Sequence, residues 1–373
     1  MARRMPAEST PARSLTAPED YLGGRTCDVE RNVELAGLTT LGLGGPARTL
    51  ISVYDTRQIV EAMRKTGEHG EPLLILAGGS NVVVSDAGFA GTVVLLRSTG
   101  IAVVTDGAEH VLVRVAAGHA LDDLVQWCVA ESLAGVECLS GIPGSVGATP
   151  IQNVGAYGQE IAEVLQAVTV YDRTLDRVVE LCAAECGFSY RTSMFKRAQR
   201  YVVLEVTLRL RRDQAGGPLR YGELSRRLAA TEQSRPPLAK IREAVLELRR
   251  AKGMVIDVTD PDTRSVGSFF TNPIVSPEQY RQLDAALGAA AEQIPHWLTG
   301  DGRVKLAAAW LIEHAGFGKG FTRGGVGVSS RHTLALVNRG GSTTELLGFA
   351  QEISCEVQRR YGVKLEHEPV LVG

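Results

Sequence analysis

The chain has 373 residues, of which 44% are apolar and 22% are charged, and its formal net charge at pH 7 is −2. This length predicts two or three domains, and the composition is typical of a globular protein. The small net charge argues against binding to nucleic acid or to an anionic membrane, and no apolar run approaches the roughly 20 residues that span a bilayer.

The beginning of the chain and its cysteines indicate a cytoplasmic protein. Residues 1–20 are rich in Pro, Ser, Thr and Ala and lack the apolar core of a secretory signal, so we expect a disordered leader. Six cysteines in a chain of this length do not suggest a disulfide scaffold. No second Cys/His pair accompanies Cys182 and Cys186, so free thiols and no metal site are expected.

In the first half of the chain, strands and helices alternate from about residue 36 onward. We expect a strand at 49–55, a helix at 56–70 that stops at a glycine, and two short strands within 72–86. A second helix at 121–133 carries one apolar stripe, formed by Leu121, Leu124, Val125 and Cys128.

In the second half, helices are expected at 238–253 and 305–316, each followed or closed by a glycine. A third helix begins with the capping box Ser342 and Glu345 and ends at Gly362. A strand over 363–373 closes the chain. This mixture predicts an α+β fold with several lobes.

Three glycine-rich stretches are candidate ligand loops. "LGLGGPA" (41–47) fits a GxGxxA dinucleotide motif, but a strand follows it where that motif requires a helix. In "AGGSN", Gly78 and Gly79 allow a tight turn whose N–H groups bind an anion, with Ser80 and Asn81 as added donors. Taken alone, this stretch is a weak signal and is more typical of a β-hairpin with a glycine turn.

The third stretch, "SGIPGSVGATPIQNVGAYG", is the strongest of the three. Glycines at 141, 144 and 147 permit close backbone approach to a flat or phosphorylated ligand. Two such loops in one region predict one large ligand between them.

Five motifs then reveal a resemblance. "LAGGSNVVV", "GIPGSVGATPIQNVGAYG", "YRTSMFK", "VGSFFTNP" and "LEHEPVLVG" occur in the order typical of the UDP-N-acetylenolpyruvoylglucosamine reductase family. The resemblance covers the chain from about residue 36 onward. It implies a two-lobed FAD-binding unit of the vanillyl-alcohol-oxidase/PCMH type (lobes 21–97 and 98–250). A C-terminal α+β substrate domain (251–373) would follow, and its last residues would return to the active site.

The resemblance also implies the cofactors FAD and NADPH. FAD would be held by the two glycine loops, through Gly78, Gly79, Ser80, Asn81, Ile142, Pro143, Gly144, Gly147 and Ala148. The family's reaction reduces UDP-N-acetyl-3-O-(1-carboxyvinyl)-glucosamine to UDP-N-acetylmuramate, a peptidoglycan precursor. A hydride reaches the enolpyruvyl β-carbon and a proton reaches the α-carbon, which requires an acid and groups that stabilise negative charge.

By the same resemblance, Ser268 is the proton donor, and Arg191 and Glu368 polarise the substrate carboxylate. In a regular strand Glu366 would face the same way as Glu368, and only the family's order selects Glu368. Without the family, Arg191 would be interpreted as a surface residue. The residues expected to contact the substrate are Tyr157, Tyr190, Tyr221, Lys252, Asn272 and His332. "RYGEL" resembles the subtype in which an extra tyrosine loop folds over the substrate.

Two alternative functions are open. The flavin loops alone also fit an oxidase of the wider flavoprotein family, and a non-catalytic nucleotide-sugar or flavin binding protein is the third hypothesis. The combination of Ser268, Arg191 and Glu368 favours the reductase. We expect a monomer whose partner is a small UDP-sugar, and no nucleic-acid or membrane partner.

Overall fold

The structure is a computed structural model that describes residues 27–68, 70–196, 198–231, 234–287 and 293–373. The leader expected at 1–20 lies outside these residues. Within the described part, no helix is both long and apolar enough to cross a membrane.

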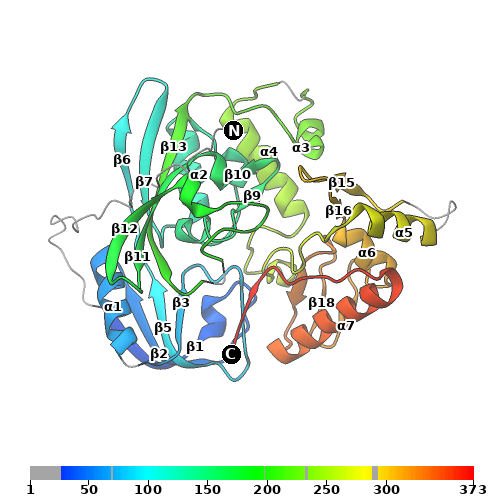
Figure 1. Cartoon of the computed structure of the whole chain (residues 1–373), viewed down its shortest axis with the longest axis horizontal. Helices are drawn as coiled ribbons and strands as arrows, with labels where there is room; N and C mark the ends of the chain where they lie inside the picture. Colours follow the sequence, from blue (N-terminus) through cyan, green and yellow to red (C-terminus); the bar gives the residue numbers. More distant parts are fainter. Residues whose placement is uncertain (1–26, 69, 197, 232–233, 288–292) are drawn as a thin grey trace, which may run out of the picture.

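The N-terminal lobe is built on a four-stranded sheet (Figure 1). In spatial order its strands are β1 (Asp28–Glu34), β2 (Pro46–Val53), β5 (Phe89–Leu96) and β3 (Leu73–Leu76). Strands β2, β5 and β3 are parallel, β1 is antiparallel, and helix α1 (Thr56–Glu68) packs on β2 and β5. Strand β4 (Val82–Val84) pairs instead with β20 (Val370–Val372) at the end of the chain. Because β3 and β4 join different sheets, the hairpin alternative for "AGGSN" is wrong.

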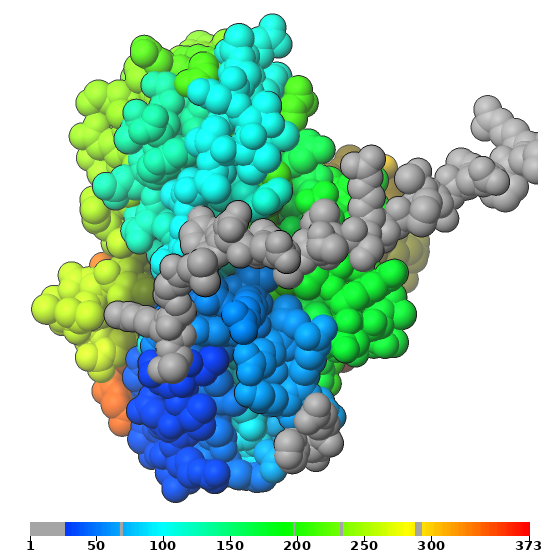
Figure 2. Space-filling view, turned by 90° about the vertical axis from the view of Figure 1, so that its left-hand side faces the viewer, coloured from blue at the N-terminus to red at the C-terminus, as the bar shows by residue number. Residues whose placement is uncertain are grey.

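The second lobe contains a larger antiparallel sheet. Its strands are β12 (Arg177–Cys182), β11 (Leu165–Asp172), β13 (Tyr201–Arg212), β7 (His110–Ala116) and β6 (Ile101–Asp106), with β8 (Leu133–Ala134) beside β13. Its helices are α2 (Leu121–Ala130), α3 (Gly222–Arg227) and α4 (Leu238–Ala251). A short hairpin of β9 (Gly155–Ala156) and β10 (Gln159–Glu160) follows the second glycine loop. Figure 2 shows the two lobes one above the other, the first in blue and the second in cyan and green.

The two lobes share one core, since Ile59 and Met63 of α1 belong to the same buried cluster as Val113 and Val206 of the second sheet. Burial of apolar surface stabilises the folded chain by roughly 25 cal/mol per Å², so a core that both lobes share holds the lobes together.

In the described residues of the C-terminal domain there are two small sheets and three α-helices. The sheets are β14 (Ile274–Val275), β16 (Val304–Leu306) and β15 (His296–Leu298), and β17 (Thr322–Arg323), β18 (Val326–Val328) and β19 (Leu336–Asn338). The helices are α5 (Pro277–Leu287), α6 (Ala308–His314) and α7 (Thr343–Tyr361). Its core includes Phe269, Leu311 and Phe349, and also Leu41 and Val83 of the first lobe. The final residues cross from α7 back to the first lobe (Figure 1).

Several expected elements are confirmed. Ser342 accepts the N–H of Glu345, whose carboxylate accepts the N–H of Ser342, and α7 ends at Gly362 in the left-handed conformation (φ 65°). The expected stripe on α2 is fully buried. The capping box belongs to α7 alone and the stripe to α2 alone, so local sequence sufficed for each.

Two expectations need correction. The helix expected at 305–316 begins only at Ala308, because Val304 and Leu306 are buried in β16 and the Asn272 side chain accepts the N–H of Ala308 at 3.0 Å. The strand expected over 363–373 is reduced to β20. Residues before Pro369 pair instead with the segment after Ser268, through a bridge between His367 and Phe270.

Candidate active site

The two predicted glycine loops lie directly against each other. A Cβ added to Gly78 would come within 2.6 Å of the Gly144 Cα, so only glycine permits this approach. Gly79 and Gly144 adopt φ values of +59° and +107°, which L side chains rarely adopt. The expectation that both loops face one ligand agrees with this geometry.

The second loop is fixed by backbone hydrogen bonds to the segment before α2. The N–H of Leu121 donates to the Gly144 carbonyl at 3.0 Å, and the N–H groups of Val146 and Gly147 donate to carbonyls of residues 119 and 117, each at 2.8 Å. Gly147 lies in the 3₁₀ helix Val146–Ala148, and a Cβ on it would meet Ala117. Ile142, Pro143 and Ala148, which complete the expected cofactor set, are half-buried in the same loop.

Two buried polar atoms beside this loop have no hydrogen-bond partner within the described residues. They are Ser145 Oγ and Arg249 Nε, and the latter would lie 3.5 Å from a Cβ on Gly141. Buried polar atoms are almost always satisfied, so an unpaired hydroxyl and an unpaired guanidinium nitrogen here fit a polar cofactor. Neither Ser145 nor Arg249 was singled out from the sequence, because only burial distinguishes them from ordinary loop and helix residues.

A cavity of about 430 Å³ opens beside Gly78. One wall comes from residues 37–42 of the first lobe, and the opposite wall comes from Ile256, Val258 and Arg264 in the segment after α4. Together with the glycine loops, it offers space for an extended ligand.

Arg191 and Glu368, which are far apart in sequence, form an ion pair. Arg191 Nε lies 3.4 Å from Glu368 Oε1, and both side chains are mostly buried (24% and 14% exposed). Arg191 Nη2 also donates to the Gly155 carbonyl at 2.8 Å, and Lys196 Nζ donates to the Arg191 carbonyl at 2.7 Å. Arg191 has a left-handed backbone (φ 51°), a strained conformation that is typical of functional sites.

Glu368 is held by contacts from both flanking segments. Its N–H donates to the Phe269 carbonyl at 2.9 Å, and Asn81 of the first glycine loop accepts the N–H of Val370 at 2.9 Å. Burial raises the pKa of Glu368, although the charges of Arg191 and Lys196 act in the opposite direction. Glu366 is exposed and does not share this position, because the segment is not a regular strand.

Ser268 lies immediately before Phe269, whose carbonyl binds Glu368 and whose N–H donates to Leu334 at 2.7 Å. Gly267, just before it, has φ +75°, so the turn that presents the serine favours glycine. Ser268 is half-buried rather than fully enclosed in the described chain. The structure thus places the three expected catalytic residues on adjoining segments.

Tyr190 and Asn272 adjoin this group and contact each other. Partial burial raises the pKa of Tyr190, and a hydrogen bond to Asn272 acts against it. Lys305 Nζ lies 4.8 Å from the Tyr190 ring centre, within cation–π range. Lys305 was missed from the sequence because it was expected inside a helix, whereas β16 places it beside Tyr190.

Tyr157, Tyr221, Lys252 and His332 form a second group. The two tyrosine rings meet edge to face at 5.3 Å, and Lys252 Nζ lies 5.7 Å from the centre of the Tyr157 ring. Lys252 also pairs with Glu223 at 2.5 Å, a contact that the sequence did not indicate. Tyr157 follows β9, whose Gly155 binds Arg191, so this short hairpin connects the two groups.

Burial and the neighbouring charges perturb this second group. Burial raises the pKa of Tyr157 to about 12. Burial, together with the positive charges of Lys252, Lys319 and Arg249, lowers the pKa of His332 to about 4. His332 is therefore neutral at pH 7, in a region with an excess of positive charge that suits an anionic ligand.

Comparisons with known proteins match both halves of the chain. Residues 47–181 match the FAD binding domain model, and residues 260–372 match the model described as UDP-N-acetylenolpyruvoylglucosamine reductase, C-terminal domain. The chain is 53% identical to the UDP-N-acetylenolpyruvoylglucosamine reductase of Thermobifida fusca, covering 93% of this chain and 99% of that one. It is 52% identical to the enzyme of that name from Salinispora arenicola, with 93% and 97% covered.

A solved structure supports the fold. The crystal structure of UDP-N-acetylenolpyruvylglucosamine reductase from Thermus caldophilus superposes with a TM-score of 0.62 and 26% identity, covering 93% of this chain and all of that one. The expected fold class, a PCMH-type FAD-binding unit followed by a C-terminal α+β domain, is confirmed. The chain therefore belongs to the UDP-N-acetylenolpyruvoylglucosamine reductase family, and it is an FAD- and NADPH-dependent oxidoreductase of peptidoglycan precursor synthesis.

Proposed function

We propose that this chain reduces UDP-N-acetyl-3-O-(1-carboxyvinyl)-glucosamine to UDP-N-acetylmuramate, with Ser268 as proton donor and the Arg191–Glu368 pair at the substrate carboxylate. The observation that supports this assignment is the convergence of Arg191 and Glu368, which are 177 positions apart, on the segment that carries Ser268. Bound FAD, once reduced by NADPH, supplies the hydride for the enolpyruvyl β-carbon.

The loops at 78–81 and 142–148 would hold the cofactor. The backbone N–H groups of the first loop suit its phosphates, and Ser145 and Arg249 offer polar atoms that lack a protein partner within the described residues. Because both loops are fixed by hydrogen bonds and close glycine packing, little ordering is needed when the cofactor binds.

Arg191 would bind the substrate carboxylate as a cation whose position is set in advance. Its backbone is held by Lys196 and its guanidinium by the Gly155 carbonyl. Because burial raises the pKa of Glu368, this carboxyl group stays protonated to a higher pH than an exposed one, and in that state it donates a hydrogen bond. The Arg191 cation would stabilise the charge that spreads into the substrate carboxylate, and Glu368, when protonated, would add a hydrogen bond to it.

Ser268 would donate its hydroxyl proton to the α-carbon. A free serine is a weak acid, but the developing carbanion is a strong base, so transfer is favourable once the two atoms are in contact. The turn at Gly267 and the hydrogen bonds of Phe269 orient this hydroxyl.

The substrate's UDP group would be bound by the second group of residues. Lys252 suits a diphosphate as a point charge, and Tyr157, Tyr221 and His332 surround it. Tyr190 and Asn272 would contact the sugar side. Tyr221 is 42% exposed at the start of α3, which supports an assignment to the subtype with the extra tyrosine loop.

We also propose the domain boundaries expected from the sequence, at 97/98 and 250/251, and a monomeric, cytoplasmic enzyme. Strand β5 ends at Leu96 and helix α4 at Ala251, each within one residue of a proposed boundary.

The test is an anaerobic visible spectrum of the purified protein. NADPH is expected to bleach the flavin, and the enolpyruvyl substrate alone is expected to restore its colour. Recovery only on admission of air would instead favour an oxidase. A protein that binds no flavin after incubation with FAD would contradict the assignment of both glycine loops.

A further inference from the structure

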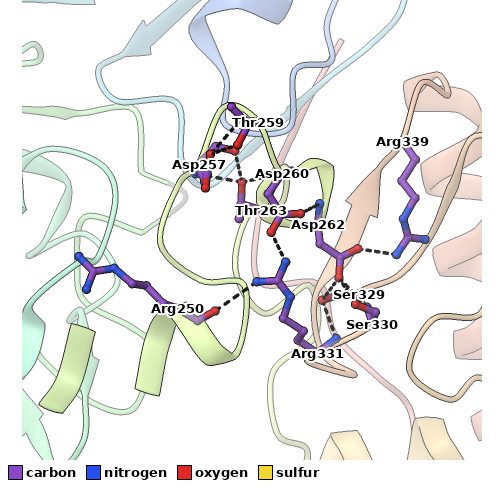
Figure 3. Close-up of polar contacts among 10 residues, drawn as sticks. All are labelled: Arg250, Asp257, Thr259, Asp260, Asp262, Thr263, Ser329, Ser330, Arg331 and Arg339. Atoms are coloured by element: carbon purple, nitrogen blue, oxygen red, sulfur yellow. Dashed lines mark hydrogen bonds and ion pairs between the residues drawn. The ribbon is translucent and has the colours of Figure 1, made fainter. Parts of the chain in front are cut away.

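A polar network joins the end of α4 to the C-terminal domain (Figure 3). Its centre is Asp262, whose side chain is 8% exposed and whose carboxylate accepts four hydrogen bonds. The donors are the hydroxyl of Ser329 at 3.0 Å, the N–H of Ser330 at 2.7 Å and its hydroxyl at 2.6 Å, and the guanidinium of Arg339 at 2.5 Å. Burial raises the pKa of Asp262, but these donors outweigh it and leave the pKa below its usual value.

Arg331 extends this network to α4. Its guanidinium pairs with Asp260, which precedes the 3₁₀ helix Pro261–Thr263, and donates to the carbonyl of Arg250 at 3.2 Å. Its own N–H donates to Ser329 Oγ at 3.1 Å. The end of α4 and the turn at Asp260 therefore meet the distant segment 329–331 at one side chain, as Figure 3 shows.

The two residues next to these contacts belong to the candidate substrate site. Lys252 follows Arg250 by two positions, and His332 follows Arg331 directly. Gly253, in the left-handed conformation, packs on the network, since a Cβ on it would lie 3.3 Å from the Asp262 carbonyl oxygen and 3.8 Å from Arg331 Nη1. Burial lowers the pKa of His332 and the positive charge of Lys252 lowers it further, so the Lys252 charge acts on His332.

The charges within the network balance. Asp260 and Asp262 are paired with Arg331 and Arg339, so the network has no unpaired charge to offer a ligand. Its geometry instead determines where Lys252 and His332 lie relative to each other. The same segment, through Ile256 and Val258, also lines the cavity beside Gly78.

We propose that Arg331 is a positioning residue for UDP binding, which acts through Lys252. By holding the Arg250 carbonyl and Asp260 together, it keeps the end of α4 against the C-terminal domain, so that Lys252 and His332 face the same ligand. This inference depends on the proposed function for the assignment of Lys252 to the UDP group.

The test is a double-mutant cycle with UDP as the probe, measured calorimetrically on the FAD-loaded enzyme. R331M is expected to raise the Kd for UDP about tenfold, the usual effect of losing a hydrogen bond to a charged group. In a K252M background, R331M is expected to change the Kd less than about twofold, because the residue through which it acts is already gone. R331K keeps the charge but cannot make both contacts of the guanidinium, so its Kd for UDP is expected to lie between those of the wild type and R331M.

The matched control is R323M, which breaks the exposed pair of Arg323 with Glu352 in the same domain and should leave the Kd unchanged. The inference is wrong if R331M binds UDP like the wild type, or if R331M weakens binding by the same factor with and without Lys252. If R331M does not fold, D260N removes the same ion pair and enters the same cycle. If the wild type failed to turn over the enolpyruvyl substrate, the proposed function would be wrong. The UDP cycle tests the role of Arg331 separately, because it measures only UDP binding.

Discussion

The proposed cofactor side and the proposed substrate side of this site are built differently. On the cofactor side, glycine backbones pack at near-contact distance, and main-chain hydrogen bonds fix the loops, as between Gly144 and Leu121. On the substrate side, charged side chains hold each other, as in the pairs of Arg191 with Glu368 and of Lys252 with Glu223. The first arrangement is complete before a ligand arrives, whereas the second contains cations whose present partners must be shared or exchanged. Substitutions in the glycine loops should therefore act through steric overlap, and substitutions among the charged residues should act through the loss or gain of charge.

The largest loss of FAD binding and activity is expected from a substitution in the glycine loops. G78A places a methyl group against Gly144, and because both loops are fixed, the cofactor groove must deform. The purified variant should be colourless and inactive, as measured by its visible spectrum after incubation with FAD. G348A is the control, since Gly348 lies in α7 with open space around its Cβ position. A yellow, active G78A enzyme would contradict the shape argument.

The next effect concerns the proposed proton donor. S268A should slow flavin reoxidation by the enolpyruvyl substrate about 10²–10⁴-fold, the range typical of general acid catalysis, while flavin reduction by NADPH stays near the wild-type rate. Stopped-flow spectroscopy separates the two half-reactions. S276A is the matched control, because Ser276 caps α5 and lies outside the site. If both half-reactions of S268A stayed fast, another group would be the donor.

A smaller effect, on the affinity for UDP, is expected from substitutions of the charged pair of Lys252 and Glu223. K252M should weaken UDP binding about tenfold, since a charge-assisted contact to the diphosphate is lost. E223Q removes only the present partner of Lys252, so it should leave binding unchanged or tighten it. Calorimetric titration with UDP compares the two variants. Equal weakening in both would show that the pair acts as a structural unit rather than as a cation with an exchangeable partner.

The smallest effect is on stability and depends on pH. Because the pKa of Glu368 is raised in the folded chain, the folded state binds more protons than the unfolded state between the ordinary value of 4.5 and the raised one. The contribution of Glu368 to stability is therefore full below pH 4.5 and is lost as the pH rises through the folded pKa. E368Q removes this dependence, so its Tm relative to the wild type should increase over that window. A constant Tm difference across the window would mean that burial does not perturb this carboxyl group.

Some features of the fold and site are encoded locally and were predictable. The capping box at Ser342, the stop at Gly362 and the buried stripe of α2 depend on residues within one or two turns of helix. The second glycine loop was also recognisable as a candidate ligand loop, since a purely structural loop rarely needs so many glycines, whereas the first was a weak signal by itself. The roles of Arg191 and Glu368 came from the family's motifs, because neither residue is unusual in its local sequence.

What the sequence by itself determined is therefore the family, the main helices and the residues that match its motifs. The tertiary structure decided which of those residues touch, and it added neighbours such as Glu223, Arg249 and Lys305 that no motif marks. In the tertiary structure residues 304–306 also form a strand, and Arg331 donates a hydrogen bond to the end of α4. The physical reason is that strand pairing, burial and ion pairing depend on groups far apart in the chain, and these meet only once the core has formed.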